Sequence, residues 1–237
     1  MGDEDKKKTE IIKTLRGMPM NSQTKCPKCD LKRLPAPINK INFGGQEMSL
    51  FKGYVDKSLL KALNFGDKII FLKARAILIF LDPLEEILYL ERENALAKFH
   101  LLNVMTIVCC AIEGFGHYLT GEVGMGTATP AFKKFVKTFM NADFQKVYDG
   151  ETYSDILWKY FRNGLAHGFV IERGGIERYM HEYFNINPKI GLEIDIDKFV
   201  LDFKKAFGEF FEKLLSEGEN SELGNNFKKV FHKILCA

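Results

Sequence analysis

The sequence predicts a mainly α protein, a helical bundle with a small β-hairpin or sheet insert that follows residue 168. Two patterns predict this fold class. Apolar residues recur every three or four positions through most of the chain after residue 50, as they do on the buried face of a helix. Alternation of apolar and polar residues, which is typical of strands, begins after residue 168.

The composition is that of a globular domain. The chain has 237 residues, of which 46% are hydrophobic and 27% are charged, and this is enough for one sizeable core with appendages. The formal net charge is +3, which neither requires nor excludes a nucleic acid partner, because local clustering of charge decides phosphate binding. The 21 Phe residues indicate core packing rather than base stacking.

Residues 1–50 differ from the rest of the chain. Turn and linker signals follow one another there, including Pro19, Pro35, Pro37 and Gly44-Gly45. We therefore expect a flexible N-terminal segment over residues 1–50 and a single helical domain over residues 51–237.

Cys26-Pro27-Lys28-Cys29 in this segment is half of a zinc knuckle. A closed structural zinc site needs four ligands, and no second C-x-x-C follows. A distant His or the same pair from a partner chain would have to complete the site. We expect no cofactor, with a structural zinc at Cys26 and Cys29 as the alternative.

The cysteines and apolar runs indicate a cytoplasmic protein. Five cysteines are an odd number, Cys109 and Cys110 are adjacent, and the charged N-terminus lacks the apolar region of a signal peptide. Apolar runs such as residues 76–81 and 104–112 fall short of the roughly 20 residues that span a bilayer. No membrane partner is expected.

A series of helices is expected between residues 57 and 119. Residues 57–63 form a short one, while residues 69–81 fit a strand or a helix equally well. Asp82-Pro83 has the pattern of an N-cap followed by Pro at the first helical position. Residues 93–119 form the most apolar helix of the chain.

Glu113 interrupts the apolar surface of that helix. A carboxylate among apolar neighbours either reaches solvent or has a cationic partner, for which Arg162 and His167 are candidates. His117, one turn further on, is either a surface histidine or a second proton carrier.

The stretch 121–130 contains three glycines but lacks the Lys-Ser or Lys-Thr of a phosphate-binding loop, so we interpret it as a loop between helices. Thr129 and Pro130 are expected to start the next helix. Lys133, Lys134 and Lys137 lie on its polar face. They are candidates for weak RNA binding, or else form an ordinary solvated face.

The following helix carries the chemically most capable residues. Thr152 and Asp155 have the spacing of a capping box, which predicts that Arg162 and His167 lie on a helix or at its end. Asn163 and His167 are about 40° apart around the axis and share a face, and a long Arg162 side chain can reach round to it. A guanidinium that binds phosphate, an imidazole that transfers protons and an amide that orients either suit phosphodiester chemistry. The alternative is an ordinary helix C-terminus, where Arg and His complement the helix dipole.

After this helix, residues 169–179 are expected to form a hairpin around a Gly174-Gly175 turn, and residues 192–196 to add a third strand. Asp197 is expected to cap a helix that ends at Gly218, with a last amphipathic helix after it. We expect the apolar faces of these two helices to be buried within the same subunit, with a role of either helix as the dimer surface as the alternative.

The segment from Arg162 to His167 resembles the R-x4-6-H motif of HEPN domains, with the polar Asn163 directly after the Arg as is usual in that family. The similarity covers roughly residues 68–215 and, outside the motif, rests on pattern rather than identities. It implies a HEPN-like helical bundle, usually dimeric, in which two motifs meet in a cleft. An acidic residue on an earlier helix, here Glu113, often orients the motif in this family.

The resemblance implies a metal-independent endoribonuclease that cleaves RNA by attack of the 2′-hydroxyl, with Arg162, His167 and Asn163 as catalytic residues. It implies RNA and a second copy of the chain as partners, and a toxin or phage-defence context with an inhibitory partner protein is a further expectation. The alternative is a non-catalytic HEPN module that binds RNA or nucleotides, or that serves as a scaffold for other proteins.

Overall fold

A computed structural model describes residues 24–25, 32–33, 40–43, 46–49, 57–93, 100–168 and 170–236, with side chains for residues 57–88, 100–168 and 170–236. The chain divides into two compact units, residues 1–86 with 234–237, and residues 87–233. Cys26 and Cys29 lie outside the described residues, as does the expected domain boundary between residues 50 and 51. The described residues are mostly helical with small sheets, so the prediction of a mainly α fold is confirmed.

The first unit contains two short antiparallel strand pairs and the first helices. The strands are β1 (Thr24–Lys25) with β2 (Lys32–Arg33), and β3 (Lys40–Phe43) with β4 (Gln46–Ser49). Helix α2 (Lys57–Ala62) is the expected short helix. Asn64 then caps α3 (Phe65–Ala76) by accepting a hydrogen bond from the Asp67 backbone N–H.

The stretch 69–81, for which strand and helix were both open, is helical. It forms most of α3 and the π-helical turn η1 (Ile77–Leu81), and α4 (Asp82–Glu93) follows without a break. The interpretation of Asp82 as an N-cap is therefore wrong, because Asp82 has helical backbone angles and its N–H bonds to the Ile77 carbonyl. The wider π turn lets the chain pass Pro83, which has no N–H to donate.

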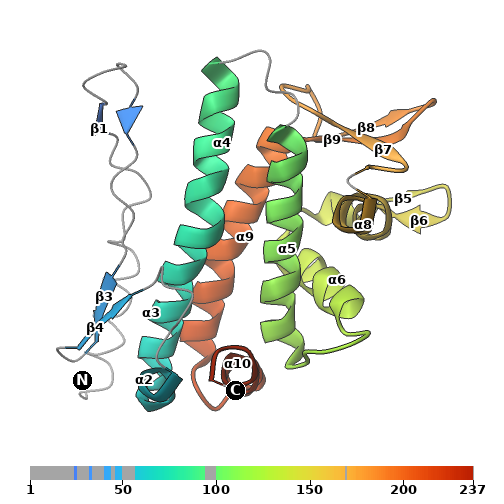
Figure 1. Ribbon diagram of the computed structural model, residues 1–237. Helices are drawn as coiled ribbons and strands as arrows, with labels where there is room; N and C mark the ends of the chain where they lie inside the picture. Colours follow the sequence, from blue (N-terminus) through green and yellow to red (C-terminus); the bar gives the residue numbers. More distant parts are fainter. Residues whose placement is uncertain are drawn as a thin grey trace. The chain divides into compact units, whose positions relative to one another are not determined.

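The second unit is built around helix α5 (His100–Thr120). Helix α6 (Ala128–Phe139) packs along α5, and α9 (Ile196–Glu217) and α10 (Glu222–Phe231) also pack against it (Figure 1). The turn η4 (His232–Cys236) follows α10. Phe115 of α5 lies at the centre of an aromatic cluster, with its ring centroid 5.3 Å from that of Phe210 and 5.4 Å from that of Phe207. The expectation that Phe residues serve core packing is confirmed, since the largest fully buried side chains are all Phe.

Helix α5 is also long and apolar enough to cross a membrane, by length and composition alone. Half of its most apolar 18-residue window is buried inside the protein. A core helix of a globular domain meets the same criterion, so this feature is weak evidence for a membrane span.

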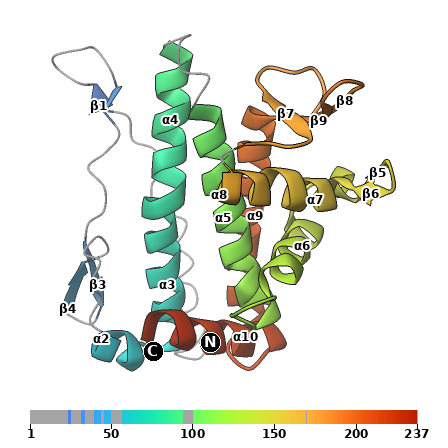
Figure 2. The same cartoon turned by 45° about the vertical axis from the view of Figure 1, so that its right-hand side comes forward.

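The segment that carries Arg162 and His167 crosses α5 (Figure 2). It consists of α7 (Tyr153–Ile156), the π-helical turn η3 (Leu157–Arg162) and α8 (Asn163–Gly168). The predicted capping box is confirmed, because Thr152 accepts a hydrogen bond from the Asp155 N–H and the Asp155 carboxylate accepts one from the Thr152 N–H. The short helix η2 (Ala142–Gln145) and the strands β5 (Val147–Tyr148) and β6 (Glu151–Thr152) precede it.

A three-stranded sheet follows this segment, in the order β7-β9-β8. The expected hairpin around Gly174-Gly175 is wrong, since both glycines lie inside β7 (Gly174–Glu177), which pairs in parallel with β9 (Gly191–Asp195). The hairpin is instead formed by β8 (Phe184–Asn187) and β9. The strand expected at residues 192–196 is confirmed as β9, whose Leu192 and Ile194 are fully buried.

Two expected helix caps are displaced by two residues. The cap of α9 is Asp195 rather than Asp197, because its carboxylate accepts hydrogen bonds from the N–H groups of Lys198 and Met180. Asp197 instead pairs with Arg178, with Oδ1 and Nη2 2.7 Å apart. Helix α6 begins after Thr127 rather than Thr129, since Ala128 and Thr129 are already helical ahead of Pro130. The end of α9 at Gly218 is as predicted.

Candidate functional site

Arg162 lies at the end of η3, where it meets Glu113 of α5. Its Nε donates to Glu113 Oε2 at 2.8 Å, and its Nη2 lies 2.6 Å from the same oxygen. Both side chains are largely buried, with 20% of Arg162 and 18% of Glu113 exposed. The expectation that Glu113 has a cationic partner is confirmed, and the partner is Arg162. A charged pair with this little exposure interacts more strongly than one in bulk water.

Asn163 is the second contact of Arg162. The Arg162 Nη1 donates to Asn163 Oδ1 at 3.0 Å, so the arginine does reach round to the side of the helix that bears Asn163. The Trp158 ring, with its centroid 4.8 Å from Arg162 Cζ, supports the guanidinium by a cation–π contact. The guanidinium is therefore held by a carboxylate, an amide and an aromatic ring.

The π turn explains why these groups meet. In η3 the N–H of Asn163 bonds to the carbonyl of Trp158, five residues earlier, so the helix is locally wider than an α-helix. Such single π turns occur often at functional sites. The sequence gives only a weak indication of this role of Trp158, which is the only Trp of the chain and precedes Arg162 by four residues.

His167 lies near the end of α8 and its side chain is exposed. In the described part of the chain no hydrogen bond or ion pair involves its imidazole. Five residues separate it from Arg162, which corresponds to a rise of about 7.5 Å along an ideal helix. The structure thus brings Arg162, Asn163 and Glu113 into contact, whereas His167 stands apart from them and is open to solvent.

His117 extends the cluster on the other side of Glu113. Its Nδ1 lies 2.7 Å from the carbonyl oxygen of Glu122, which can only accept, so Nδ1 carries the proton in this contact. Its Nε2 lies 3.8 Å from Glu113 Oε1, and only 12% of the side chain is exposed. His117 is therefore a neighbour of the carboxylate rather than an open surface histidine.

Cys110 also lies in the electrostatic field of this cluster, which the sequence did not indicate. Burial raises the pKa of the Cys110 thiol, an effect that Arg162 opposes and Glu113 reinforces. Cys110 is exposed, but its raised pKa does not favour a nucleophilic role, because nucleophilic cysteines need a lowered pKa.

Gly164 allows the chain that follows α8 to pass close to the helix. A Cβ atom added there would lie 2.2 Å from the carbonyl oxygen of Val170, whose N–H donates to the Gly164 carbonyl at 3.3 Å. Only glycine allows this close approach. The chain after the helix is thereby folded back against the segment that carries Arg162.

The three lysines of α6 have different environments. Lys133 forms an ion pair with Asp155, the residue that completes the capping box of α7. Burial acts to raise the pKa of Asp155, but hydrogen bonds from Lys133 and Thr152 outweigh it and hold the pKa below its usual value. Lys134 and Lys137 are exposed. Lys133 therefore has a structural contact, and RNA binding by Lys134 and Lys137 stays a prediction.

Among residues 57–93, 100–168 and 170–236, no group of three or more His, Cys, Asp and Glu side chains is placed to hold a metal ion. The zinc alternative at Cys26 and Cys29 falls outside the described residues.

Comparisons of this chain with protein-family models, with curated proteins and with solved structures gave no match. The resemblance to HEPN domains therefore rests on the sequence alone, chiefly on the motif from Arg162 to His167.

Proposed function

We propose that the protein is a HEPN-type, metal-independent endoribonuclease that acts as a homodimer. The observation that carries this proposal is the fixed guanidinium of Arg162, held by Glu113 and Asn163, on the same short helical segment as the exposed imidazole of His167. Cleavage of a phosphodiester by its neighbouring hydroxyl requires a cation that binds the phosphate and a group that transfers protons at the same phosphate.

In this mechanism His167 transfers protons, and Arg162 stabilises the negative charge that develops on the phosphoryl oxygens. The 2′-hydroxyl gives its proton to an imidazole, its oxygen attacks the phosphorus, and the bond to the 5′-oxygen breaks as that oxygen receives a proton. The products are a 2′,3′-cyclic phosphate and a 5′-hydroxyl. The Glu113 and Asn163 contacts use three of the five N–H groups of Arg162, so one N–H on each terminal nitrogen can bind a phosphoryl oxygen.

Glu113 and Asn163 are positioning residues in this account. They restrict the Arg162 side chain before substrate binds, which reduces the entropy that binding would otherwise cost. The Trp158 ring contacts one face of the Arg162 guanidinium and so restricts its movement.

One imidazole cannot readily accept one proton and donate another in the same step. The exposed position of His167 allows a second copy of the chain to bring its own motif to the same phosphate. This is the chemical reason for proposing a homodimer. The proposed setting is the cytoplasm, with RNA as substrate, and a toxin or phage-defence role would require an inhibitory partner protein.

A second candidate, a non-catalytic HEPN module that binds RNA or proteins, is favoured by one observation. Arg162 is largely buried and its charge is already balanced by Glu113. In that case the Arg162 pair stabilises the helix crossing and does not meet a phosphate.

A cleavage assay with two matched strands separates the two candidates. Wild-type protein is incubated in EDTA with an oligoribonucleotide and with a matched strand that carries 2′-O-methyl groups throughout. Cleavage of the first strand only, with cyclic phosphate ends, supports the nuclease. Cleavage of both strands rejects attack by the 2′-hydroxyl. Cleavage of neither strand over a range of sequences rejects the nuclease and leaves the binding module.

A further inference from the structure

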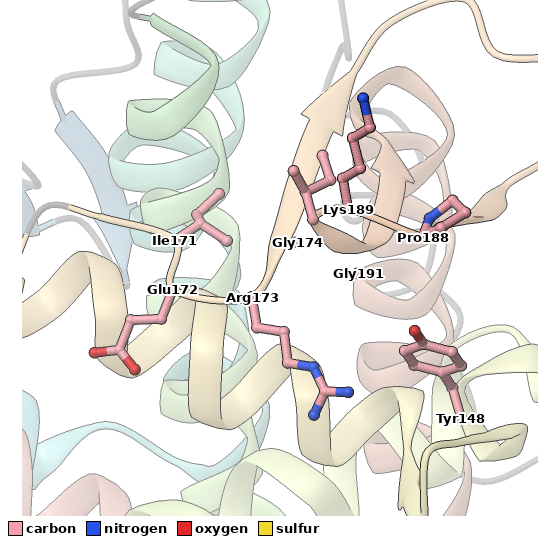
Figure 3. A pocket seen from close by; sticks show the side chains of 9 residues that line it. Tyr148, Ile171, Glu172, Arg173, Gly174, Pro188, Lys189 and Gly191 are labelled. Atoms are coloured by element: carbon pink, nitrogen blue, oxygen red, sulfur yellow. The ribbon is translucent and has the colours of Figure 1, made fainter.

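A pocket of about 340 Å³ lies between the β5–β6 turn and the three-stranded sheet (Figure 3). Its lining includes Tyr148, Ile171, Arg173, Gly174, Pro188 and Lys189. Figure 3 shows the side chain of Arg173 extending toward Tyr148, with Pro188 and Lys189 on the other side of the pocket and the Lys189 ammonium group directed outward from it. Its volume is at the lower end of the range for small-molecule sites, so it suits a ligand of mononucleotide size.

Arg173 forms part of the wall of this pocket and is held there by several contacts. Its Nη2 pairs with Asp149, and its Nη1 lies 3.8 Å from Glu151 Oε2. Its Cζ lies 5.6 Å from the ring centroid of Tyr148 and 5.8 Å from that of Tyr160. Because two carboxylates balance its charge, Arg173 offers a rigid planar surface rather than a free cation. Guanidinium planes and aromatic rings are the surfaces on which unpaired bases of RNA stack.

Lys189 supplies the charge that Arg173 does not. It is exposed in the β8–β9 turn, where its backbone N–H donates to Asn187 Oδ1 at 3.0 Å. Within the described residues its ammonium group makes no hydrogen bond or ion pair. A planar surface inside the pocket and a cation at its rim match the two parts of a nucleotide, its base and its phosphate.

Gly191 keeps this arrangement possible. Its φ is +101°, and a Cβ atom there would lie 3.1 Å from Arg173 Cγ and 3.5 Å from the Arg173 carbonyl. A side chain at this position would be strained and would displace the arginine stem. The glycine lets β9 pass directly beneath the side chain that forms the pocket wall.

The pocket is close to His167 along the chain. Ile171 of its lining follows His167 by four residues, which span at most about 14 Å when extended. The hydrogen bond from Val170 N–H to the Gly164 carbonyl folds this connection back, so the separation is shorter than the extended limit.

We propose that this pocket binds one nucleotide of single-stranded RNA, next to the phosphate at His167. The base stacks on Arg173 and Tyr148, and the phosphate of that nucleotide contacts Lys189. The identity of the ligand as RNA rests on the proposed function, whereas the location of the site rests on the pocket itself.

The test measures binding without cleavage. A fluorescent 2′-O-methyl oligoribonucleotide, which lacks the attacking hydroxyl, is titrated with full-length protein and followed by anisotropy. Tyr148→Leu is expected to weaken binding about tenfold through lost stacking, while Tyr148→Phe stays within about twofold. Lys189→Ala is expected to weaken binding and to lower the salt dependence by about one released counterion.

Matched controls are Tyr179→Leu and Lys205→Ala, which alter an exposed tyrosine and an exposed lysine outside the pocket lining. The proposal is overturned if the wild type does not bind the strand, or if Tyr148→Leu and Lys189→Ala bind as the wild type does. Measuring both cleavage and binding, with His167→Ala included, separates the nuclease proposal from the pocket proposal. If neither the wild type nor any variant cleaves RNA but the pocket variants still bind the strand more weakly, the nucleotide-binding pocket is supported and the nuclease proposal is rejected.

Discussion

Glu113 and Arg162 are 49 residues apart in the sequence, yet two nitrogens of the arginine converge on one oxygen of the carboxylate, at 2.8 Å from Nε and 2.6 Å from Nη2. This pair joins α5 to the helical segment that carries His167. It therefore links the stability of the helix crossing to the position of the guanidinium that the proposed chemistry uses.

Glu113→Gln tests this link, because it removes the charge and keeps the shape. Loss of one partner of a buried pair costs about 3–5 kcal/mol, and an exposed pair contributes about 0–1 kcal/mol. The partial exposure of this pair places the expected loss at about 1–3 kcal/mol in urea unfolding. Glu217→Gln, in the exposed pair with Lys213, is the control and should change stability by less than about 0.5 kcal/mol. Equal losses in the two variants would contradict a special role for Glu113.

Gly164→Ala should destabilise the protein and expose the segment after α8 to proteolysis. The added Cβ would lie 2.2 Å from the Val170 carbonyl oxygen, so backbone must move. Gly208→Ala provides the opposite control, since nothing lies within 4 Å of its Cβ and alanine favours a helix interior by up to about 1 kcal/mol. Thermal unfolding of both variants checks the prediction. A Gly164→Ala protein as stable as the wild type would mean that residues 164 and 170 do not approach so closely.

The raised pKa of Asp202 leads us to expect a specific pH dependence of the protein's stability. Burial, reinforced by Glu209, raises the pKa of Asp202 despite hydrogen bonds from the Asn141 N–H and the Tyr183 hydroxyl and the charge of Lys205. Because the folded-state pKa is above the unfolded value, the protonated carboxyl is favoured by folding. The associated stability is complete below about pH 4 and is lost as pH rises through the folded-state pKa.

Asp202→Asn keeps an oxygen acceptor and removes this titration. The variant should be more stable than the wild type at pH 7, by up to about 1 kcal/mol, and the difference should vanish at acidic pH. Urea unfolding at several pH values measures this, with Glu212→Gln on the exposed side of the same helix as the control. A variant less stable than the wild type at pH 7 would show that the charged carboxylate is favoured.

The parts of the structure that the sequence predicted are those set by local patterns. The capping box of Thr152 and Asp155 needs only residues three apart, and the Phe stripe of α9 follows from helical periodicity. A carboxylate among apolar residues needs a cationic partner, for which the sequence offers Arg162 and His167, and in the structure the partner is Arg162.

The parts that the sequence did not predict depend on contacts between distant segments. Gly174-Gly175 has the composition of a hairpin turn, but parallel pairing with β9 draws both glycines into a strand. Asp82-Pro83 resembles a helix start, but the π turn η1 carries the helix through it. The pocket around Arg173 combines three separate segments, so no local pattern indicates it.

Thr152→Ala should cost about 1 kcal/mol of stability, since it removes the hydroxyl that caps α7 through the Asp155 N–H at 3.1 Å. Thr152→Ser keeps the hydroxyl and should lose only a few tenths of a kcal/mol. Chemical denaturation of both variants provides the comparison. If serine and alanine cost the same, the methyl group of Thr152 rather than its cap is what stabilises the helix start.

The most direct measurement of the central claim is the initial rate of RNA cleavage in EDTA by wild-type protein and by His167→Ala, with folding and dimer formation of both checked by circular dichroism and sedimentation. His181→Ala, which alters another exposed histidine, is the matched control. We predict a rate about 10²–10⁴ times lower for His167→Ala and an unchanged rate for His181→Ala. Cleavage by folded, dimeric His167→Ala at the wild-type rate would contradict this prediction.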